Sequence, residues 1–196
     1  MNFSFPIILA SNSPRRQQLL ADLGVQFEVK VVPVEESYPK DLPPEEVPLY
    51  LAQKKAGAVA KTLNSEALII GADTVVILNN AILGKPQNPD QAAEFLHRLS
   101  GNTHEVVTGV CIIYQKKTRL FKDITRVRFD NLSASEIDHY VAACRPLDKA
   151  GAYGIQEWIG MVGISGIEGS YFNVVGLPVQ KLYKELKDLR YLISDI

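Results

Sequence analysis

Cysteine is scarce in this chain, as are tryptophan and histidine. The 196 residues include two cysteines, Cys111 and Cys144, and each stands in an apolar stretch. Two cysteines are too few for a disulfide framework, and they cannot form a metal site by themselves. We therefore expect both thiols to be reduced and structural, as in a cytoplasmic protein.

Long apolar runs and an excess of one charge are also missing. No apolar run approaches the ~20 residues of a membrane span, and residues 1–10 lack the basic start and apolar core of a signal peptide. The 21 Lys and Arg nearly balance the 22 Asp and Glu, whereas nucleic-acid binders usually show a basic excess. We predict a cytoplasmic protein that binds neither nucleic acid nor membranes, and that holds any anion with a few focused residues.

The pattern of the remaining residues indicates an α/β fold with a mixed sheet, because strand-like and helix-like segments alternate. No linker marks a boundary, so residues 1–196 are expected to form a single domain. Strands are expected over Ile7–Ala10, Gln26–Val34, Ala67–Leu78, Val106–Gln115 and Leu120–Phe129, and as a short pair flanking Gly166–Gly169. Helices are expected between Ser13 and Gly24, over Glu45–Leu63 and Pro89–Leu99, from Ser133 to about Cys144 and from Pro178 to about Leu189.

Two arginines stand in the first turn of the first expected helix. Ser13 can cap this helix and Pro14 fits its first position, so Arg15 and Arg16 lie at the positive end of the helix dipole. Cations are unfavourable there unless an anion is bound by the free N–H groups and the guanidinium groups. We interpret Ser11–Arg16 as a phosphate site; the alternative is a helix cap with two surface arginines.

Asp73 is an acid inside an otherwise apolar strand. A buried carboxylate costs several kcal/mol unless it is paired, hydrogen-bonded or bound to a metal. Gly71, two residues earlier, allows a bulge or a close backbone approach. We interpret Asp73 as a metal ligand or general base at a strand end, where α/β folds place their sites. The alternative is an aspartate that closes a turn.

Four other charged residues could contribute to a site formed by Ser11–Arg16 and Asp73. Lys85 follows Gly84 without the spacing of a Walker A motif, yet it can still contact a phosphate. Lys55 shares a helix face with apolar residues and can reach inward. Glu35-Glu36 becomes relevant if a metal needs a second carboxylate. The alternative for each is an ordinary solvated surface charge.

The segment Asp148–Gln156 packs small residues around a charged pair, as in a loop whose backbone approaches a ligand. The side-chain amide of Gln156 offers one acceptor and two donors, enough to read the imide edge of uracil or thymine. The alternative is a structural turn with an ion pair. His97, His104 and His139 have no metal-ligand spacing, and His97 and His139 are expected on the surface of helices.

Taken in order, these segments closely resemble the Maf family of nucleotide pyrophosphatases. The matching stretches span nearly the whole chain: Leu9–Arg16, Gly71–Val76, Leu83–Pro86, Leu99–Gly101, Asp148–Gln156, Gly169–Tyr171 and Val175–Pro178. The resemblance implies a mixed, twisted sheet with flanking helices, like that of inosine triphosphate pyrophosphatases, with two lobes around a cleft. It also implies a homodimer.

The resemblance further implies hydrolysis of dTTP and UTP between the α- and β-phosphates, with Mg²⁺ or Mn²⁺ as the cofactor. Asp73 then accepts a proton, and it binds the metal together with Glu35. The remaining implied site residues contact the substrate: Arg15, Thr74 and Gln156 in substrate choice, and Ser11, Arg16, Lys55 and Lys85 around the phosphates. The chain departs from the family pattern at Glu157-Trp158, where small residues are common, directly after the residue that the resemblance assigns to base choice.

Two other functions fit the same residues. One is a nucleotide-binding regulator of cell division without significant hydrolysis, and the other is removal of modified pyrimidine nucleotides. The chain retains the charged positions that a hydrolase needs, which favours catalysis.

Overall fold

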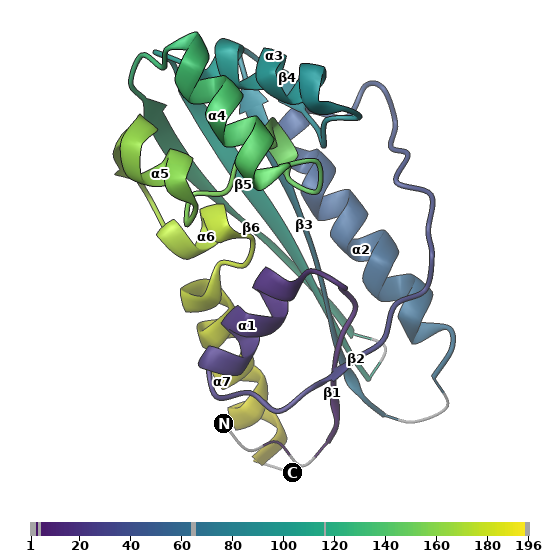
Figure 1. Ribbon diagram of the computed structural model, residues 1–196. Helices are drawn as coiled ribbons and strands as arrows, with labels where there is room; N and C mark the ends of the chain where they lie inside the picture. Colours follow the sequence, from purple (N-terminus) through teal and green to yellow (C-terminus); the bar gives the residue numbers. More distant parts are fainter. Residues whose placement is uncertain (1–2, 4, 64–65, 116, 195–196) are drawn as a thin grey trace. The chain divides into compact units, whose positions relative to one another are not determined.

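The computed structural model describes residues 3, 5–63, 66–115 and 117–194, without the side chains of residues 190–194. Within this part of the chain, seven strands form one mixed sheet in the order β2-β1-β3-β5-β6-β7, with β4 paired to β3 (Figure 1). The strands are β1 (Ile7–Leu9), β2 (Glu28–Val29), β3 (Leu68–Leu78), β4 (Ala81–Leu83), β5 (Thr103–Tyr114), β6 (Lys117–Phe129) and β7 (Ile164–Glu168). Strand β1 is parallel to both β2 and β3, whereas β4 and β7 run antiparallel to their neighbours.

Helices separate most of the strands, which confirms the expected α/β class. They are α1 (Pro14–Asp22), α2 (Val47–Ala60), α3 (Pro89–Leu99), α4 (Ala134–Cys144), α5 (Trp158–Gly163), α6 (Tyr171–Val175) and α7 (Val179–Ser194), with 3-10 turns η1 (Pro44–Glu46) and η2 (Ala150–Ala152). No helix among the described residues has the length and apolar character needed to cross a membrane.

Local chemistry placed most of these boundaries correctly. The Ser13 hydroxyl caps α1 and Pro14 opens it, and Ser133 and Glu136 form the complete capping box of α4. Asn79 and Asn80 have φ values of 50° and 63°, which suits the tight turn that joins the antiparallel strands β3 and β4.

Three expectations about strands were wrong. Over 26–34 only Glu28–Val29 pairs, since Pro33 has no N–H for a ladder and the alternating side chains there stay largely exposed. The segment flanking Gly166–Gly169 is one strand, β7, followed by helix α6. Strand β3 continues through Gly71 and Asp73 without a break, so Asp73 lies inside a strand and not at its end. The Lys116-Lys117 pair between the two long strands predicts a turn, but Lys116 lies outside the described residues.

The chain divides into two compact units. Unit 1 comprises residues 1–73, 108–123 and 176–196, and unit 2 comprises residues 74–107 and 124–175. Strands β3, β5 and β6 each contribute one part to unit 1 and the other part to unit 2. The division of β3 falls between Asp73 and Thr74, so these two predicted site residues belong to different units.

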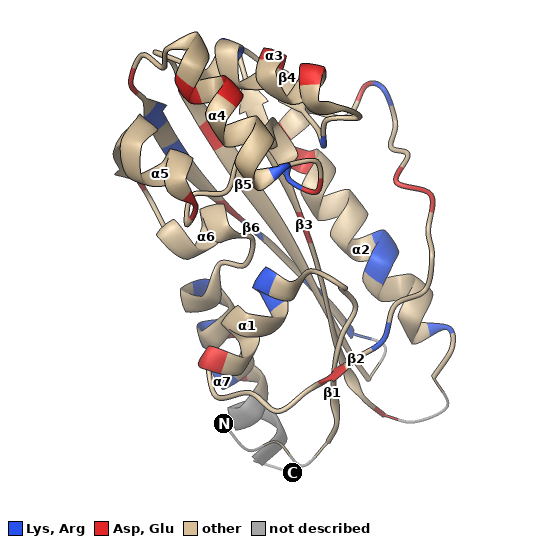
Figure 2. Cartoon of the chain, viewed as in Figure 1, with Lys and Arg blue, Asp and Glu red and all other residues tan. Residues whose placement is uncertain are grey.

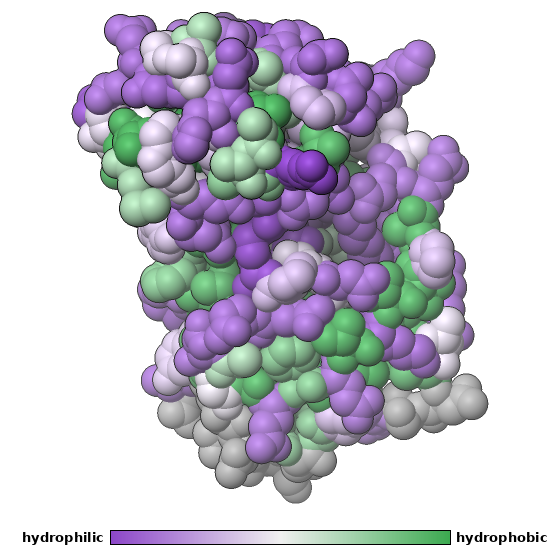
Figure 3. All heavy atoms as spheres, viewed as in Figure 1, coloured by the Kyte–Doolittle hydropathy of each residue, from purple (hydrophilic) through white to green (hydrophobic). Residues whose placement is uncertain are grey.

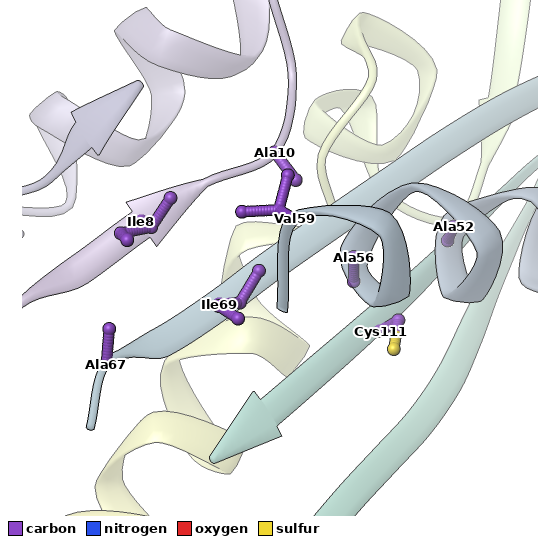
Figure 4. Packing of buried hydrophobic residues seen from close by; sticks show 8 residues of the cluster. All are labelled: Ile8, Ala10, Ala52, Ala56, Val59, Ala67, Ile69 and Cys111. Carbon is purple, nitrogen blue, oxygen red and sulfur yellow. The ribbon is translucent and has the colours of Figure 1, made fainter. Parts of the chain in front are cut away.

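In unit 1, helix α2 packs closely on the sheet through small side chains. Ala52, Ala56 and Val59 of α2 lie in one buried cluster with residues of β1, β3 and β5 (Figure 4). A Cβ atom at Gly71 of β3 would lie 2.5 Å from the backbone oxygen of Ala52, and a Cβ at Gly109 of β5 would meet the α2 backbone at 2.4 Å. Glycine at both positions is what permits this close approach.

Cys111 belongs to the same cluster, and both cysteines are free, as expected. Burial raises the pKa of the Cys111 thiol to about 11, so it remains a neutral thiol at physiological pH and acts as a small hydrophobic side chain.

In unit 2, helices α3 and α4 pack together over a core that includes Leu96, Phe129 and Tyr140. His104 is buried against Tyr153 and Phe129. The exposed apolar side chains of this unit include Met161 and Phe172. On the face drawn in Figure 3, hydrophobic groups are scattered among hydrophilic ones and form no continuous band.

Candidate active site

Three charged side chains meet in unit 1. The Lys55 ammonium lies 2.5 Å from Oδ1 of Asp73 and 2.6 Å from Oε1 of Glu36. Figure 2 shows basic residues on α2 and an acidic residue on β3. Lys55 and Asp73 are largely shielded, with 17% and 12% of their side chains exposed, whereas Glu36 is half exposed. The buried carboxylate is therefore paired, as its burial cost requires.

Gly71 explains why Lys55 reaches Asp73. Successive residues of a strand point to opposite faces, so Gly71 and Asp73 share a face. The missing side chain at Gly71 brings α2 onto that face beside Ala52 and Ala56. Lys55, which precedes Ala56 on the same helix, then places its ammonium on the carboxylate of Asp73. The expectation that Lys55 points inward is confirmed.

Arg16 is held at the start of α1. Its Nε donates a hydrogen bond of 2.9 Å to the backbone oxygen of Gly176, and its Nη1 donates one of 3.3 Å to Oγ of Ser11. Burial lowers the pKa of Arg16, and Asp73 and Glu36 act in the opposite direction. Arg16 is therefore within electrostatic reach of both carboxylates. Ser11, which is buried, also accepts from the backbone N–H of Ser13.

These groups give unit 1 the chemistry of a phosphate site. Arg16 and Lys55 supply fixed positive charge, the start of α1 adds its dipole, and Asp73 supplies a carboxylate that can accept a proton. Arg15, the other predicted arginine, is partly buried in the same helical turn, and its charge contributes to the lowered pKa of Arg16.

Glu36 is the acid that sequence reasoning placed second to Glu35. Glu35 is exposed in the loop before η1, whereas Glu36 forms the ion pair with Lys55. The two are adjacent glutamates in a loop without regular periodicity, so no sequence pattern could rank them. Among the described residues, no group of three or more His, Cys, Asp or Glu side chains is arranged to hold a metal ion.

The predicted residues of unit 2 lie on neighbouring segments. Thr74 is partly buried on β3, while Lys85 and Gln156 are exposed. The loop that leads to Gln156 is tied to the segment that carries Lys85, because the N–H of Gly151 donates to the backbone oxygen of Gly84 at 3.1 Å. Gly151 also packs against Val76 of β3, where a Cβ would meet the valine methyl at 2.9 Å.

A polar network in unit 2 was missed by sequence reasoning. The Tyr140 hydroxyl of α4 donates to Oε2 of Glu157 and accepts from the N–H of Gly154. The other oxygen of Glu157 lies 3.1 Å from the ammonium of Lys149, which also binds Asp148 at 2.7 Å. The ion pair Asp148–Lys149, part of the alternative interpretation of this segment, is thus one edge of a larger network.

Comparison with known proteins identifies the family. The family model described as Maf-like protein matches residues 6–189. The chain belongs to this family. A protein of Phocaeicola vulgatus named dTTP/UTP pyrophosphatase is 55% identical over 186 residues, covering 94% of this chain and 96% of that protein. A protein of Porphyromonas gingivalis with the same name is 54% identical, covering 94% of each.

Solved structures with a related shape include the Ham1 protein of Staphylococcus aureus. It is 19% identical to this chain, with a TM-score of 0.44, covering 63% of this chain and 71% of the Ham1 chain.

Proposed function

We propose that this protein hydrolyses dTTP and UTP to the nucleoside monophosphate and pyrophosphate. The relatives named for this activity are more than half identical to it over nearly their whole length. The observation that carries the proposal is the cluster in unit 1, where Lys55 joins Asp73 and Glu36 within electrostatic reach of Arg16. Such a cluster combines a proton acceptor with charges that suit a triphosphate.

In the proposed mechanism, Asp73 accepts the proton of a water that attacks the α-phosphorus. Lys55 holds Asp73 in place through its hydrogen bond to Oδ1. The bond from the α-phosphorus to the bridging oxygen then breaks, and pyrophosphate leaves with the bonding electrons. Arg16 and Lys55, with Ser11 as a polar neighbour, offset the charge that develops on the leaving group. Lys85 is proposed to add to this charge.

A divalent cation, Mg²⁺ or Mn²⁺, is proposed as the cofactor. The oxygens of Asp73 and Glu36 suit such a hard ion, and Glu35, the ligand inferred from the resemblance, is adjacent. Two carboxylates leave most coordination positions to phosphate oxygens and water, consistent with the way Mg²⁺ is usually held. The ion, when bound, neutralises phosphate charge.

Base choice is proposed for two uncharged residues and for Arg15, which neighbours Arg16. Gln156 is proposed to read the imide edge of uracil or thymine, with Thr74 and Arg15 contributing to selection. Gln156 is exposed and so available to a ligand. The resemblance also supports a homodimer, for which sedimentation of the intact protein is the test.

The decisive assay follows pyrophosphate release from dTTP, UTP, CTP, GTP and ATP in the presence of Mg²⁺ or Mn²⁺. We expect dTTP and UTP to give the highest kcat/KM, with the monophosphate as the second product. Binding of these nucleotides without release of pyrophosphate would refute the proposal and would favour a nucleotide-binding regulator. Including 5-methyl-UTP and pseudo-UTP shows whether modified pyrimidines are preferred.

A further inference from the structure

Glu157 occupies a helix N-cap but does not cap the helix. It precedes α5, and its side chain makes no capping hydrogen bond, whereas Asp, Asn, Ser and Thr are the residues that usually cap a helix from this position. Its carboxylate turns back instead, toward Tyr140 of α4 and Lys149 of the loop before η2. The Glu157 carboxylate therefore stabilises the loop that carries Gln156, and not the first turn of α5.

The turn around Gln156 is held from both ends. The Glu157 N–H donates to the backbone oxygen of Gly154 at 3.0 Å, which closes the turn. The Gly154 N–H donates to the Tyr140 hydroxyl at 3.0 Å. Because this hydroxyl also donates to Glu157, one tyrosine connects the first and last residues of the segment 154–157.

Packing leaves this turn little freedom. A Cβ at Gly154 would lie 2.8 Å from Cδ of Glu157, so the carboxylate sits directly over the glycine. Tyr140 is fully buried, and only 9% of the Lys149 side chain is exposed. The following residue, Trp158, meets the ring of His139 at 5.0 Å with an interplanar angle of 68°. Two consecutive residues of α4 therefore contact Glu157 and Trp158, the N-cap and the first residue of α5.

We propose that Tyr140, Glu157 and Lys149 are positioning residues that fix the turn bearing Gln156 and thereby set base selectivity. This inference rests on the proposed role of Gln156 in base recognition. Side chains that hold a recognition group within a narrow range of positions affect selectivity without touching the ligand. The Glu157-Trp158 departure from the family pattern is then a second way of ordering the loop, and not a disruption of the base site.

The first test measures the turn itself. Tyr140→Phe removes only the hydroxyl and keeps the ring in the core. We expect faster hydrogen exchange of the Gly154 and Glu157 amides in this variant, with little change at amides of β5. Glu168→Gln, which removes an exposed carboxylate near Arg126 in the same unit, is the matched control and should leave these amides unchanged. Unchanged exchange in Tyr140→Phe would overturn the proposal.

The second test connects the turn to selection. We expect Tyr140→Phe to lower the ratio of kcat/KM for dTTP over CTP by about five-fold, the order of one lost hydrogen bond. Glu157→Ala should lower it further than Glu157→Gln, which keeps an oxygen for Tyr140. In a Gln156→Ala background, Tyr140→Phe should change the ratio less than two-fold, because the residue it positions is gone.

A purely structural role gives a different result. It would reduce kcat for all substrates together with the melting temperature, leave the dTTP-to-CTP ratio unchanged, and act equally in the Gln156→Ala background; this outcome overturns the proposal. If the wild-type protein releases no pyrophosphate from any triphosphate, the proposed function fails instead. The ratio of the Kd values for dTTP and CTP, measured by calorimetry on the same variants, then decides the positioning role.

Discussion

The two units fix their predicted site residues by different means. In unit 1, ion pairs hold the site residues: Lys55 pairs with Asp73 and Glu36, and both carboxylates raise the pKa of Arg16 against the effect of its burial. In unit 2, hydrogen bonds to a buried hydroxyl order the turn that carries an uncharged amide, Gln156. Under the proposed function, unit 1 acts on the phosphates common to all substrates, and unit 2 distinguishes one base from another.

The largest effect is expected from Asp73→Asn. Asparagine keeps the shape and one oxygen for Lys55 but accepts a proton poorly, so kcat should fall by about 1,000-fold, within the range of a lost general base. The fall should be the same for dTTP, UTP and CTP, which pyrophosphate release at saturating nucleotide measures. If kcat fell for one nucleotide and stayed near normal for the others, Asp73 would act in base selection, and the proposed division between the two units would be wrong.

Stability of unit 2 should depend on His104 in mildly acidic solution. Burial lowers the pKa of His104 to about 4 from 6.5, and its Nε2 shares a hydrogen bond of 2.7 Å with the Tyr153 hydroxyl. The folded protein therefore favours the neutral ring. The resulting stability is fully present above pH 6.5 and is lost as the pH falls toward 4, by up to about 3 kcal/mol.

Urea unfolding between pH 7 and pH 4.5 measures this loss, with His104→Gln as the comparison. Glutamine can still bond to Tyr153 but does not titrate, so the variant should lose less stability than the wild type over this range. Equal pH dependence in both proteins would show that other groups account for the acid sensitivity.

Within unit 1, a smaller effect is expected from the adjacent glutamates Glu35 and Glu36, and the two variants can be compared directly. Glu36→Gln removes the charge that pairs with Lys55 and should lower kcat/KM for all bases by about 10-fold, as for other supporting residues around a site. Glu35→Gln should lower it less than Glu36→Gln, because Glu35 is exposed. The Mg²⁺ dependence of both variants is the measurement; a larger effect at Glu35 would restore Glu35 as the principal ligand.

Local signals in the sequence predicted much of this molecule. Ser13, Pro14 and the Ser133–Glu136 pair act within a single helical turn, so their effect is visible in the sequence. Asp73 was identified because a carboxylate in an apolar strand needs a partner. The inward reach of Lys55 was also predicted, since Lys55 shares a helix face with apolar residues, but its ion pair with Asp73 was not.

What the sequence concealed depends on contacts between distant segments. Gly71 left two readings open, a bulge or a close backbone approach; the structure shows the close approach, of α2 against an intact strand. Tyr140 was an unremarked helix residue, and Glu157 was a departure from the family pattern. They are in contact because α4 packs beside the loop, and no residue spacing in the sequence predicts this contact.

The most direct test of the claim that unit 2 selects the base while unit 1 acts on the phosphates is the Gln156→Ala variant, assayed for kcat/KM on dTTP and CTP. Loss of a recognising hydrogen bond should reduce the dTTP-to-CTP ratio by about 10-fold, while activity on CTP stays within about two-fold of the wild type because the charges of unit 1 are intact. An unchanged ratio with an equal loss on both substrates would contradict the account, since Gln156 would then act on the common chemistry and not on the base.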